Sequence, residues 1–182
     1  MIVCSYFCDE AFFPCSQRMR ASASELGLEI DVRRLPDQGS WEGNAALLPT
    51  FSRQMLDIHV GVDLLIIDPD AVFRTAPQRL LKPDFEEDVA LFFAGTGKPH
   101  PGTLFLKNTR KARMFLNQWN KINETRGGLD CYGALVAVTT KPLLVQVCHL
   151  GPEYYWVDRV MRPSYPGIYP VVEYFMQYRV PA

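Results

Sequence analysis

Two aspartates directly follow an apolar run near the middle of this chain. The run Leu64-Leu65-Ile66-Ile67 leads into Asp68-Pro69-Asp70. A short run of this kind is typical of a buried strand in a parallel sheet, and open α/β sheets bind ligands at the carboxyl ends of such strands. Two carboxylates at one strand end repel each other unless a cation or a proton compensates them. Because Mg²⁺ and Mn²⁺ prefer oxygen ligands and also bind substrate phosphates, the pattern predicts a metal and phosphate site.

Strands and helices must position this pair. The apolar patterns predict strands at Met1–Phe7, Ile30–Leu35, Val62–Asp68, Val89–Ala94, Thr103–Lys107 and Leu143–Cys148. They predict helices at Phe13–Leu26, Asn44–His59 with a break near Pro49, Pro77–Leu81, Thr109–Thr125 and Cys131–Val138. A loop from Gly95 to Gly102 and an irregular, aromatic tail from Gly151 are expected between and after them. This alternation predicts an α/β fold with a mainly parallel sheet.

Composition limits the class of protein. The 182 residues match one domain of ordinary size. With 19 basic and 20 acidic residues the net charge is −1, which gives no overall basic field for nucleic acid. No apolar run approaches the ~20 residues of a membrane span, and the N-terminal sequence lacks the pattern of a signal peptide. We therefore expect a cytoplasmic protein without a membrane span.

The cysteines predict free thiols rather than disulfides or a zinc site. Their number is odd and no CxxC pair occurs, so in a cytoplasmic chain buried, unpaired thiols are the simplest interpretation. The five positions are Cys4, Cys8, Cys15, Cys131 and Cys148.

Four ordered segments resemble a known family. Asp68-Pro69-Asp70 is similar to the DxD motif of GT-A fold nucleotide-diphosphosugar glycosyltransferases, in particular the small bacterial and phage type. The other segments that resemble this family are Leu35–Asn44, Gly102–Thr109 with Phe115–Trp119, and Gly151–Trp156 with Pro170–Phe175. The resemblance implies a GT-A-like, Rossmann-like mixed sheet, mainly parallel and flanked by helices, in a single domain over residues 1–182.

The resemblance also implies a nucleotide-sugar donor, most simply a UDP-sugar, together with Mn²⁺ or Mg²⁺. Asp70 would ligate the metal, and Asp68 would face the donor sugar or ribose as a second metal-site and catalytic residue. Ser5 and Tyr6, at the end of the first strand, would contact the nucleotide base. For Tyr6 a place in the core is an equal alternative.

Other positions carry further implied roles. Arg18 would pair with phosphate or with the region of Asp68, and Gly102 and Thr103 would let a sugar approach the backbone. Asp130 matches an acidic position near the acceptor, where a carboxylate acts as general base in inverting members. The alternative for Asp130 is an N-cap of the helix that begins at Cys131.

The chain departs from the family pattern at one metal-ligand position. Relatives often carry a histidine where this chain has Tyr174. Because a neutral tyrosine is a poor ligand for Mg²⁺, metal binding would depend on Asp70, phosphates and water, with Glu173 as a further candidate.

The acceptor stays open between a glycan, a small molecule and modified DNA. Phage glycosyltransferases of this kind decorate hydroxylated bases, and a basic patch would suit such an acceptor. The residues for that patch are Lys107, Arg110, Lys111, Arg113, Arg159, Arg162 and Arg179. Because the chain is short for this fold, a homo-oligomer or a partner subunit is a further expectation.

Two other functions fit part of the sequence. A HAD-type phosphohydrolase also has an apolar strand followed by D-x-D, with the first carboxylate, here Asp68, as nucleophile. Against it, two strand–helix units precede Asp68, whereas that motif normally lies near the N-terminus. The second alternative is a non-catalytic domain that binds a nucleotide or a protein partner without turnover.

Overall fold

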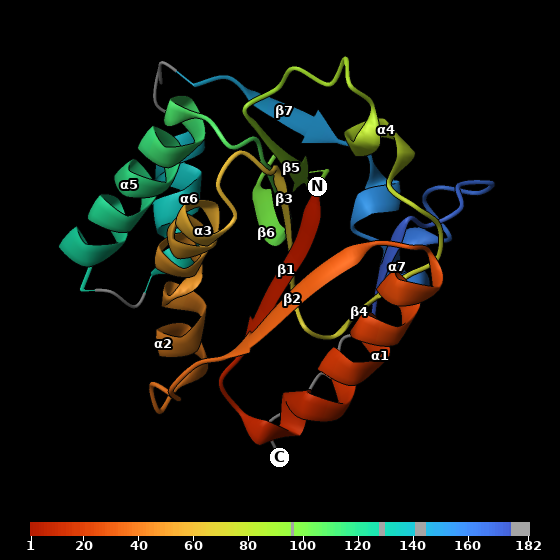
Figure 1. Cartoon of the computed structure of the whole chain (residues 1–182), viewed down its shortest axis with the longest axis horizontal. Helices are drawn as coiled ribbons and strands as arrows, with labels where there is room; N and C mark the ends of the chain where they lie inside the picture. The colour runs from red at the N-terminus through yellow and green to blue at the C-terminus, as the bar shows by residue number, and fades with distance from the viewer. Residues whose placement is uncertain (96, 128–129, 141–144, 176–182) are drawn as a thin grey trace.

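A six-stranded sheet forms the centre of the molecule, in the order β2-β1-β3-β6-β5-β7 (Figure 1). The computed structural model describes residues 1–95, 97–127, 130–140 and 145–175. Strand β6 runs antiparallel to β3 and β5, whereas the pairs β1–β2, β1–β3 and β5–β7 are parallel. This confirms the expected mainly parallel, mixed sheet. The strands are β1 (Ile2–Phe7), β2 (Glu29–Arg34), β3 (Leu64–Ile67), β5 (Val89–Phe93), β6 (Pro99–Leu106) and β7 (Val147–Leu150).

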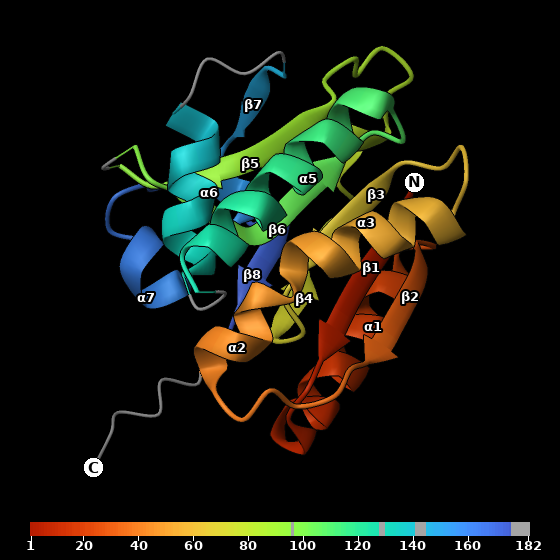
Figure 2. The same ribbon diagram turned by 90° about the vertical axis from the view of Figure 1, so that its left-hand side faces the viewer.

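Helices and a second, two-stranded sheet cover the two faces of the central sheet. Figure 2 looks onto the face covered by α3 (Leu48–Ile58), α5 (Arg110–Thr125) and α6 (Cys131–Thr140), next to the short α2 (Trp41–Ala46). The opposite face packs against α1 (Phe13–Glu25), α4 (Gln78–Leu81), α7 (Asp158–Met161) and the pair β4 (Ala71–Phe73) and β8 (Val172–Tyr174). Each face therefore has its own apolar core, and the sheet between them is buried on both sides.

Most predicted elements lie within a few residues of the observed ones, but three regions differ. The expected loop Gly95–Gly102 is wrong in its second half, because β6 already begins at Pro99. The last strand of the sheet is Val147–Leu150 rather than Leu143–Cys148, of which residues 143 and 144 lie outside the described part. The tail is not irregular throughout, since it forms α7 and β8. A strand of three residues shows no periodicity, so β4 and β8 give no sequence signal before they pair.

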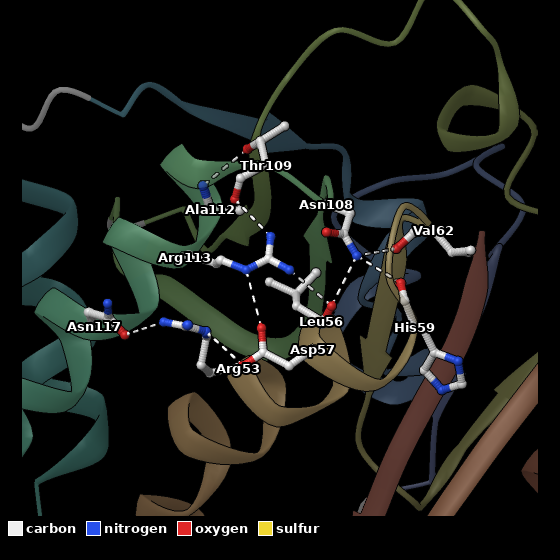
Figure 3. Close-up of polar contacts among 10 residues, drawn as sticks. All are labelled: Arg53, Leu56, Asp57, His59, Val62, Asn108, Thr109, Ala112, Arg113 and Asn117. Atoms are coloured by element: carbon white, nitrogen blue, oxygen red, sulfur yellow. Dashed lines mark hydrogen bonds and ion pairs between the residues drawn. The ribbon is translucent and has the colours of Figure 1, made fainter.

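The side chain of Asn108 joins the end of α3 to the start of α5 (Figure 3). Its amide nitrogen lies 3.1, 2.8 and 3.1 Å from the carbonyl oxygens of Leu56, His59 and Val62. These carbonyls belong to the last turn of α3 and the loop after it, where no helical N–H group is left to bond them. Asn108 therefore satisfies the end of α3, which sets the direction in which β3 begins.

Four of the seven residues expected to form a basic patch bond within the protein, whereas Arg110 and Arg159 are exposed and form no ion pair with the described residues. Lys107 donates to a backbone carbonyl at 3.2 Å, and Lys111 lies 3.4 Å from an aspartate carboxylate. Arg113 bonds a carboxylate of α3 at 3.3 Å, as Figure 3 shows, and Arg162 pairs with an aspartate at 2.6 Å. Arg179 lies outside the described residues. The positive charge available for a polyanion is accordingly smaller than the sequence suggests.

The cysteine expectation agrees with the structure. All five cysteines are free, four of them buried and Cys148 half-buried. Among the helices in the described part of the chain, none combines the length and the apolar character needed to cross a bilayer.

Asn108→Ala is expected to lower the free energy of unfolding by about 1–3 kcal/mol, because three hydrogen bonds are lost and the carbonyl of Val62 is left without a donor. The carbonyls of Leu56 and His59 keep one donor each, from Arg113 and from the N–H of Val62. Urea denaturation followed by circular dichroism measures this change. Asn117→Ala is the matched control, since Asn117 is exposed and makes one contact, 3.0 Å from Arg53. Equal losses in the two variants would contradict the role given to Asn108.

Candidate active site

The two carboxylates lie in the turn that joins β3 to β4. Strand β3 ends at Ile67, one residue earlier than expected, and the N–H of Ala71 donates to the carbonyl of Asp68 at 3.2 Å to close the turn. Asp68 and Asp70 are both half-buried. The parallel strand β1 ends at the same edge of the sheet. The prediction that the pair lies at the end of a central, buried strand is confirmed.

An irregularity in β6 brings the backbone at Gly102 against this turn. Strand β6 pairs Leu104 with Leu91 of β5, but the next pair joins His100 to Phe92, so three residues of β6 lie outside that ladder. Extra residues in one strand bend it and change the direction of its side chains. Pro101 lies in this stretch and has no N–H to donate to a ladder. The bend therefore turns residues 101–103 away from β5 and toward the end of β3.

Gly102 lies against both the backbone and the side chain of Asp68. The N–H of Asp68 donates to the carbonyl of Gly102 at 3.1 Å. A Cβ atom at position 102 would lie 2.9 Å from Oδ2 of Asp68 and 2.8 Å from Cε2 of Tyr155. Only glycine leaves room for both side chains, so the predicted importance of Gly102 has a steric basis here.

Tyr174, near the C-terminal end of the described residues, also contacts the backbone of Gly102. Strand β8 pairs with β4 so that Tyr174 lies opposite Ala71, and its buried hydroxyl donates to the carbonyl of Gly102. The same hydroxyl lies 2.7 Å from Oγ1 of Thr103, which donates to the carbonyl of Tyr154 at 2.5 Å. The side chain at the position of the expected third metal ligand is therefore a clamp on the backbone of β6.

The electrostatics of the pair favour a nearby cation. Burial, and then the negative charge of Asp70, raise the pKa of Asp68 to about 7. Burial also raises the pKa of Asp70, although its own backbone N–H and the positive charge of Arg18 act in the opposite direction. Burial and the charge of Asp68 keep the pKa of Tyr174 well above its ordinary value, so its phenol stays neutral. A divalent cation beside the two aspartates would offset the cost of ionising both.

The donor set fits an ion that is also bound by phosphates. Within the described ranges no group of three or more His, Cys, Asp or Glu side chains is arranged to hold a metal. Glu173 is not available as a third ligand, because it pairs with Arg74 at 2.6 Å. Mg²⁺ is usually held by one or two protein carboxylates while substrate phosphates and water fill the other positions. Asp68 and Asp70 match that pattern.

Arg18 lies beside Asp70, as the effect of its charge shows. Its guanidinium lies 5.8 Å from the centre of the Phe175 ring, and Arg74 lies 5.6 Å from the same centre. A nitrogen of Arg18 also donates to Sγ of Cys15 at 3.3 Å. The charge of Arg18 thus acts on Asp70, and an anion bound near the carboxylate pair would feel this positive charge.

Ser5 and Tyr6 lie at the end of β1, next to β3. Ser5 is fully buried, and its hydroxyl has no hydrogen-bond partner among the described residues. The Tyr6 ring packs 4.8 Å from that of Phe51, and its hydroxyl donates to the carbonyl of Asn44 at 2.9 Å. Burial, and then the charge of Asp68, raise the pKa of Tyr6. Tyr6 therefore belongs partly to the core and lies near Asp68.

Asp130 is the N-cap of α6. One carboxylate oxygen accepts the N–H of Gly133 at 2.8 Å, and the other lies 2.7 Å from the Arg126 guanidinium. These bonds lower its pKa. Burial, and then the charges of Asp68 and Asp130, raise the pKa of Cys131, so both carboxylates lie near its thiol. The contacts of Asp130 are those of an N-cap. A role of Asp130 as general base stays a prediction.

His100 lies in the segment for which the sequence predicted a loop, Gly95 to Gly102, and it was not among the predicted site residues. In the structure it lies on β6, half-buried, with its ring 3.8 Å from Tyr155 and 5.4 Å from Tyr132. Its Nδ1 is buried without a partner among the described residues, and burial lowers its pKa to about 4, so the ring is neutral at pH 7. The period-two series His100, Gly102, Leu104 was the one available signal.

The aromatic segment at the start of the tail belongs to the core. Tyr154, Tyr155 and Trp156 are at most 6% exposed. Tyr155 packs between Phe92, at 5.3 Å, and Tyr174, at 4.5 Å. Tyr155 is the ring that lies against Gly102, and Phe92 and Tyr174 pack on it.

Comparison with solved structures identifies the fold. No family model and no curated protein matches the sequence. A glycosyltransferase involved in the glycosylation of the major capsid of PBCV-1 superposes with a TM-score of 0.73 at 10% identity, over 95% of this chain and 92% of that chain. Two structures of the glycosyltransferase GlyE of Streptococcus pneumoniae TIGR4 superpose with TM-scores of 0.68 and 0.65 at 12% and 13% identity. This chain is covered to 97% in both, but spans 55% of the GlyE chain. The expected GT-A-like fold is confirmed.

Tyr174→Phe is expected to lower the free energy of unfolding by about 0.5–1.5 kcal/mol, because the buried carbonyl of Gly102 loses one of its two donors and keeps the N–H of Asp68. Thermal and urea unfolding measure the loss. Tyr169→Phe serves as control, since Tyr169 is 84% exposed. A Tyr174→Phe variant as stable as the wild type would show that the clamp contributes nothing.

Proposed function

We propose that this chain, which has a glycosyltransferase fold, transfers a sugar from a nucleotide-diphosphate sugar to an acceptor hydroxyl. The observation that carries the proposal is the pair Asp68 and Asp70, held at the end of β3 against the backbone of Gly102. The raised pKa values of both carboxylates mark the place as one that gains from a bound cation. A diphosphate with its counter-ion is a ligand of that kind, and a UDP-sugar is our first candidate.

The ends of β1, β3 and β6 supply the donor site. Ser5 and Tyr6 would lie along the base and ribose, and the buried hydroxyl of Ser5, which has no partner among the described residues, would gain a hydrogen bond if the donor uncovers it. Arg18 would bind a phosphate oxygen. Gly102 and Thr103 would border the sugar through Asp68, which packs directly against the backbone at position 102.

Mn²⁺ or Mg²⁺ would be held by Asp70 and Asp68 together with the donor phosphates. When bound, such an ion stabilises the negative charge that develops on the leaving diphosphate. The protein contributes a fixed position for both carboxylates. The turn that closes on Ala71 and the Tyr174 clamp on Gly102 keep this position before the donor arrives.

Asp130 is our candidate for the base that takes the proton of the acceptor hydroxyl. It lies at the N-terminus of α6, and its charge and that of Asp68 both act on the thiol of Cys131. Its ion pair with Arg126 is exposed, with 43% and 48% of the side chains accessible, and such pairs are easily exchanged. The acceptor itself is a glycan, a small molecule or a hydroxylated base in DNA. The partly neutralised basic run favours the first two.

The alternatives make different products. A phosphohydrolase that used Asp68 as nucleophile would release inorganic phosphate from simple esters without a sugar donor. A non-catalytic domain would bind UDP with Mn²⁺ and turn over no acceptor. The similarity of the whole fold to glycosyltransferases supports transfer over both.

Asp70→Asn is expected to lower sugar transfer by at least about 100-fold, the effect of removing one group that stabilises developing charge. Transfer is measured by mass spectrometry, with a panel of nucleotide sugars against simple glycans, small alcohols and hydroxymethylated DNA. EDTA should abolish it, and Mn²⁺ should restore it.

Asp84→Asn is the control for this variant, because Asp84 is an exposed carboxylate in the loop before β5. Unchanged transfer by a folded Asp70→Asn variant would remove Asp70 from the mechanism. Release of inorganic phosphate that depends on Asp68 would replace the proposal by the phosphohydrolase.

Asp130→Asn is expected to lower transfer by about 100-fold or more if the carboxylate is the base. Asparagine still caps a helix, and the ion pair is exposed, so the free energy of unfolding should change by less than about 1 kcal/mol. Full activity in this variant would reduce Asp130 to its cap role.

A further inference from the structure

A shallow depression lies between α6 and the hairpin that joins β5 to β6. It encloses about 510 Å³, a volume within the range of small-molecule sites. Lys98 lines it from the hairpin, Arg126 from the end of α5, and Tyr132, Val136 and Ala137 from α6. The surface thus combines an aromatic ring and two small apolar side chains with two cations. We call this the α6 groove.

The α6 groove connects to the carboxylate pair through a row of rings. Tyr155 lies against Gly102, where a Cβ atom would touch both it and Asp68. The His100 ring lies 3.8 Å from Tyr155 and 5.4 Å from Tyr132, which lines the groove. The groove is therefore separated from the carboxylate pair by two rings, as expected of a subsite for the second substrate.

The charge of the α6 groove is positive. None of the residues that line it is acidic. Lys98 is exposed and makes no ion pair with the described residues. Arg126 pairs with Asp130 through one nitrogen, at 2.7 Å, and a guanidinium has five N–H donors in all. Two donors on either side of an apolar wall suit an anionic group carried by a ring with an apolar face.

A second depression, of about 430 Å³ beside β8, makes a useful comparison. Its two arginines, Arg74 and Arg162, pair with Glu173 and Asp158, which line the same depression. Its charge is balanced internally, so it has no preference for an anion. The α6 groove differs in that respect.

The glycine at position 133 maintains this arrangement. A Cβ atom there would collide with the carboxylate of Asp130 and with the guanidinium of Arg126. The missing side chain lets the Arg126–Asp130 pair lie over the first turn of α6, which keeps the guanidinium at the rim of the groove.

We propose that the α6 groove binds the acceptor, and that this acceptor is a saccharide with an anionic substituent, a carboxylate or a phosphate. Tyr132, Val136 and Ala137 contact the apolar face of a sugar ring, and Lys98 and Arg126 bind the anion. The role of this saccharide as the acceptor rests on the proposed function. Binding of the saccharide to the α6 groove can be measured without any sugar transfer.

The test uses the whole chain and three probes. These are a tetrasaccharide of alternating glucuronate and N-acetylglucosamine, the neutral chitotetraose of equal length, and N-acetylglucosamine 6-phosphate. Calorimetry gives the affinities, and ¹⁵N NMR shows whether the amides of Tyr132 and Gly133 shift. Binding of the acidic tetrasaccharide with shifts at these amides, and no comparable binding of chitotetraose, is the expected result. The phosphate probe shows which anion is preferred.

Lys98→Glu should weaken binding of the acidic tetrasaccharide at least about tenfold, equivalent to about 1.4 kcal/mol. Arg126→Gln should weaken it as well. Lys121→Glu is the matched control, because Lys121 is an exposed lysine on α5 outside the groove, and it should bind like the wild type. Lys98 is exposed, so its variant is expected to fold, and circular dichroism verifies this.

Three results would overturn the proposal. They are equal binding of neutral and acidic saccharides, an unchanged affinity in Lys98→Glu, and binding of duplex DNA that Lys121→Glu weakens as much as Lys98→Glu does. Binding of UDP with Mn²⁺, measured in the same samples, separates the two hypotheses. If UDP binds in a way that needs Asp70 but no saccharide binds in the groove, the proposed function is supported and this inference is wrong. If the saccharide binds in the groove but UDP does not bind, the proposed donor site is wrong and the saccharide site is supported.

Discussion

The contact between the Asp68 carboxylate and the backbone of Gly102 is the constraint on which the site depends. Strands β3 and β6 run antiparallel, so the first residues of β6 meet the last residue of β3 and the turn after it. The three residues that β6 adds between two pairs with β5 bend its backbone toward that turn. Without a side chain at position 102, the carboxylate and Tyr155 can both pack there. A sheet that was parallel throughout would end β6 at this edge instead of starting it here.

Closure of the site comes from the other end of the chain. Strand β8 pairs with β4, which follows the carboxylates directly, and so Tyr174 is delivered to the carbonyl of Gly102. A buried carboxylate pair is costly, and burial is what raises both pKa values. The neutral phenol of Tyr174 adds no charge that would compensate them. The fold thus accepts a local destabilisation at this edge, which is typical of sites that bind a charged ligand.

Helix α6 links the two halves of the proposed reaction. Its first residue, Cys131, lies close enough to both Asp68 and Asp130 for their charges to raise the pKa of its thiol. Its exposed side forms one wall of the groove with Lys98 and Arg126. A donor at the end of β3 and an acceptor in the groove would therefore meet at the N-terminus of this helix. The packing of α6 on α5, where the Trp119 indole donates to the carbonyl of Cys131 at 3.0 Å, fixes its position.

The sequence by itself determined the local features. The apolar run before Asp68, the helical spacing of α5 and the odd number of cysteines are properties of neighbouring residues, and they predicted a buried strand, an amphipathic helix and free thiols correctly. Only the tertiary structure decided what lies around the carboxylates. The β4–β8 pair, the burial of His100 and the internal bonds of the basic run join residues that are far apart in the chain. Such contacts form because both faces of the sheet must be buried. The periodicity of one segment shows which of its sides is apolar, but it does not show which distant segment packs against that side.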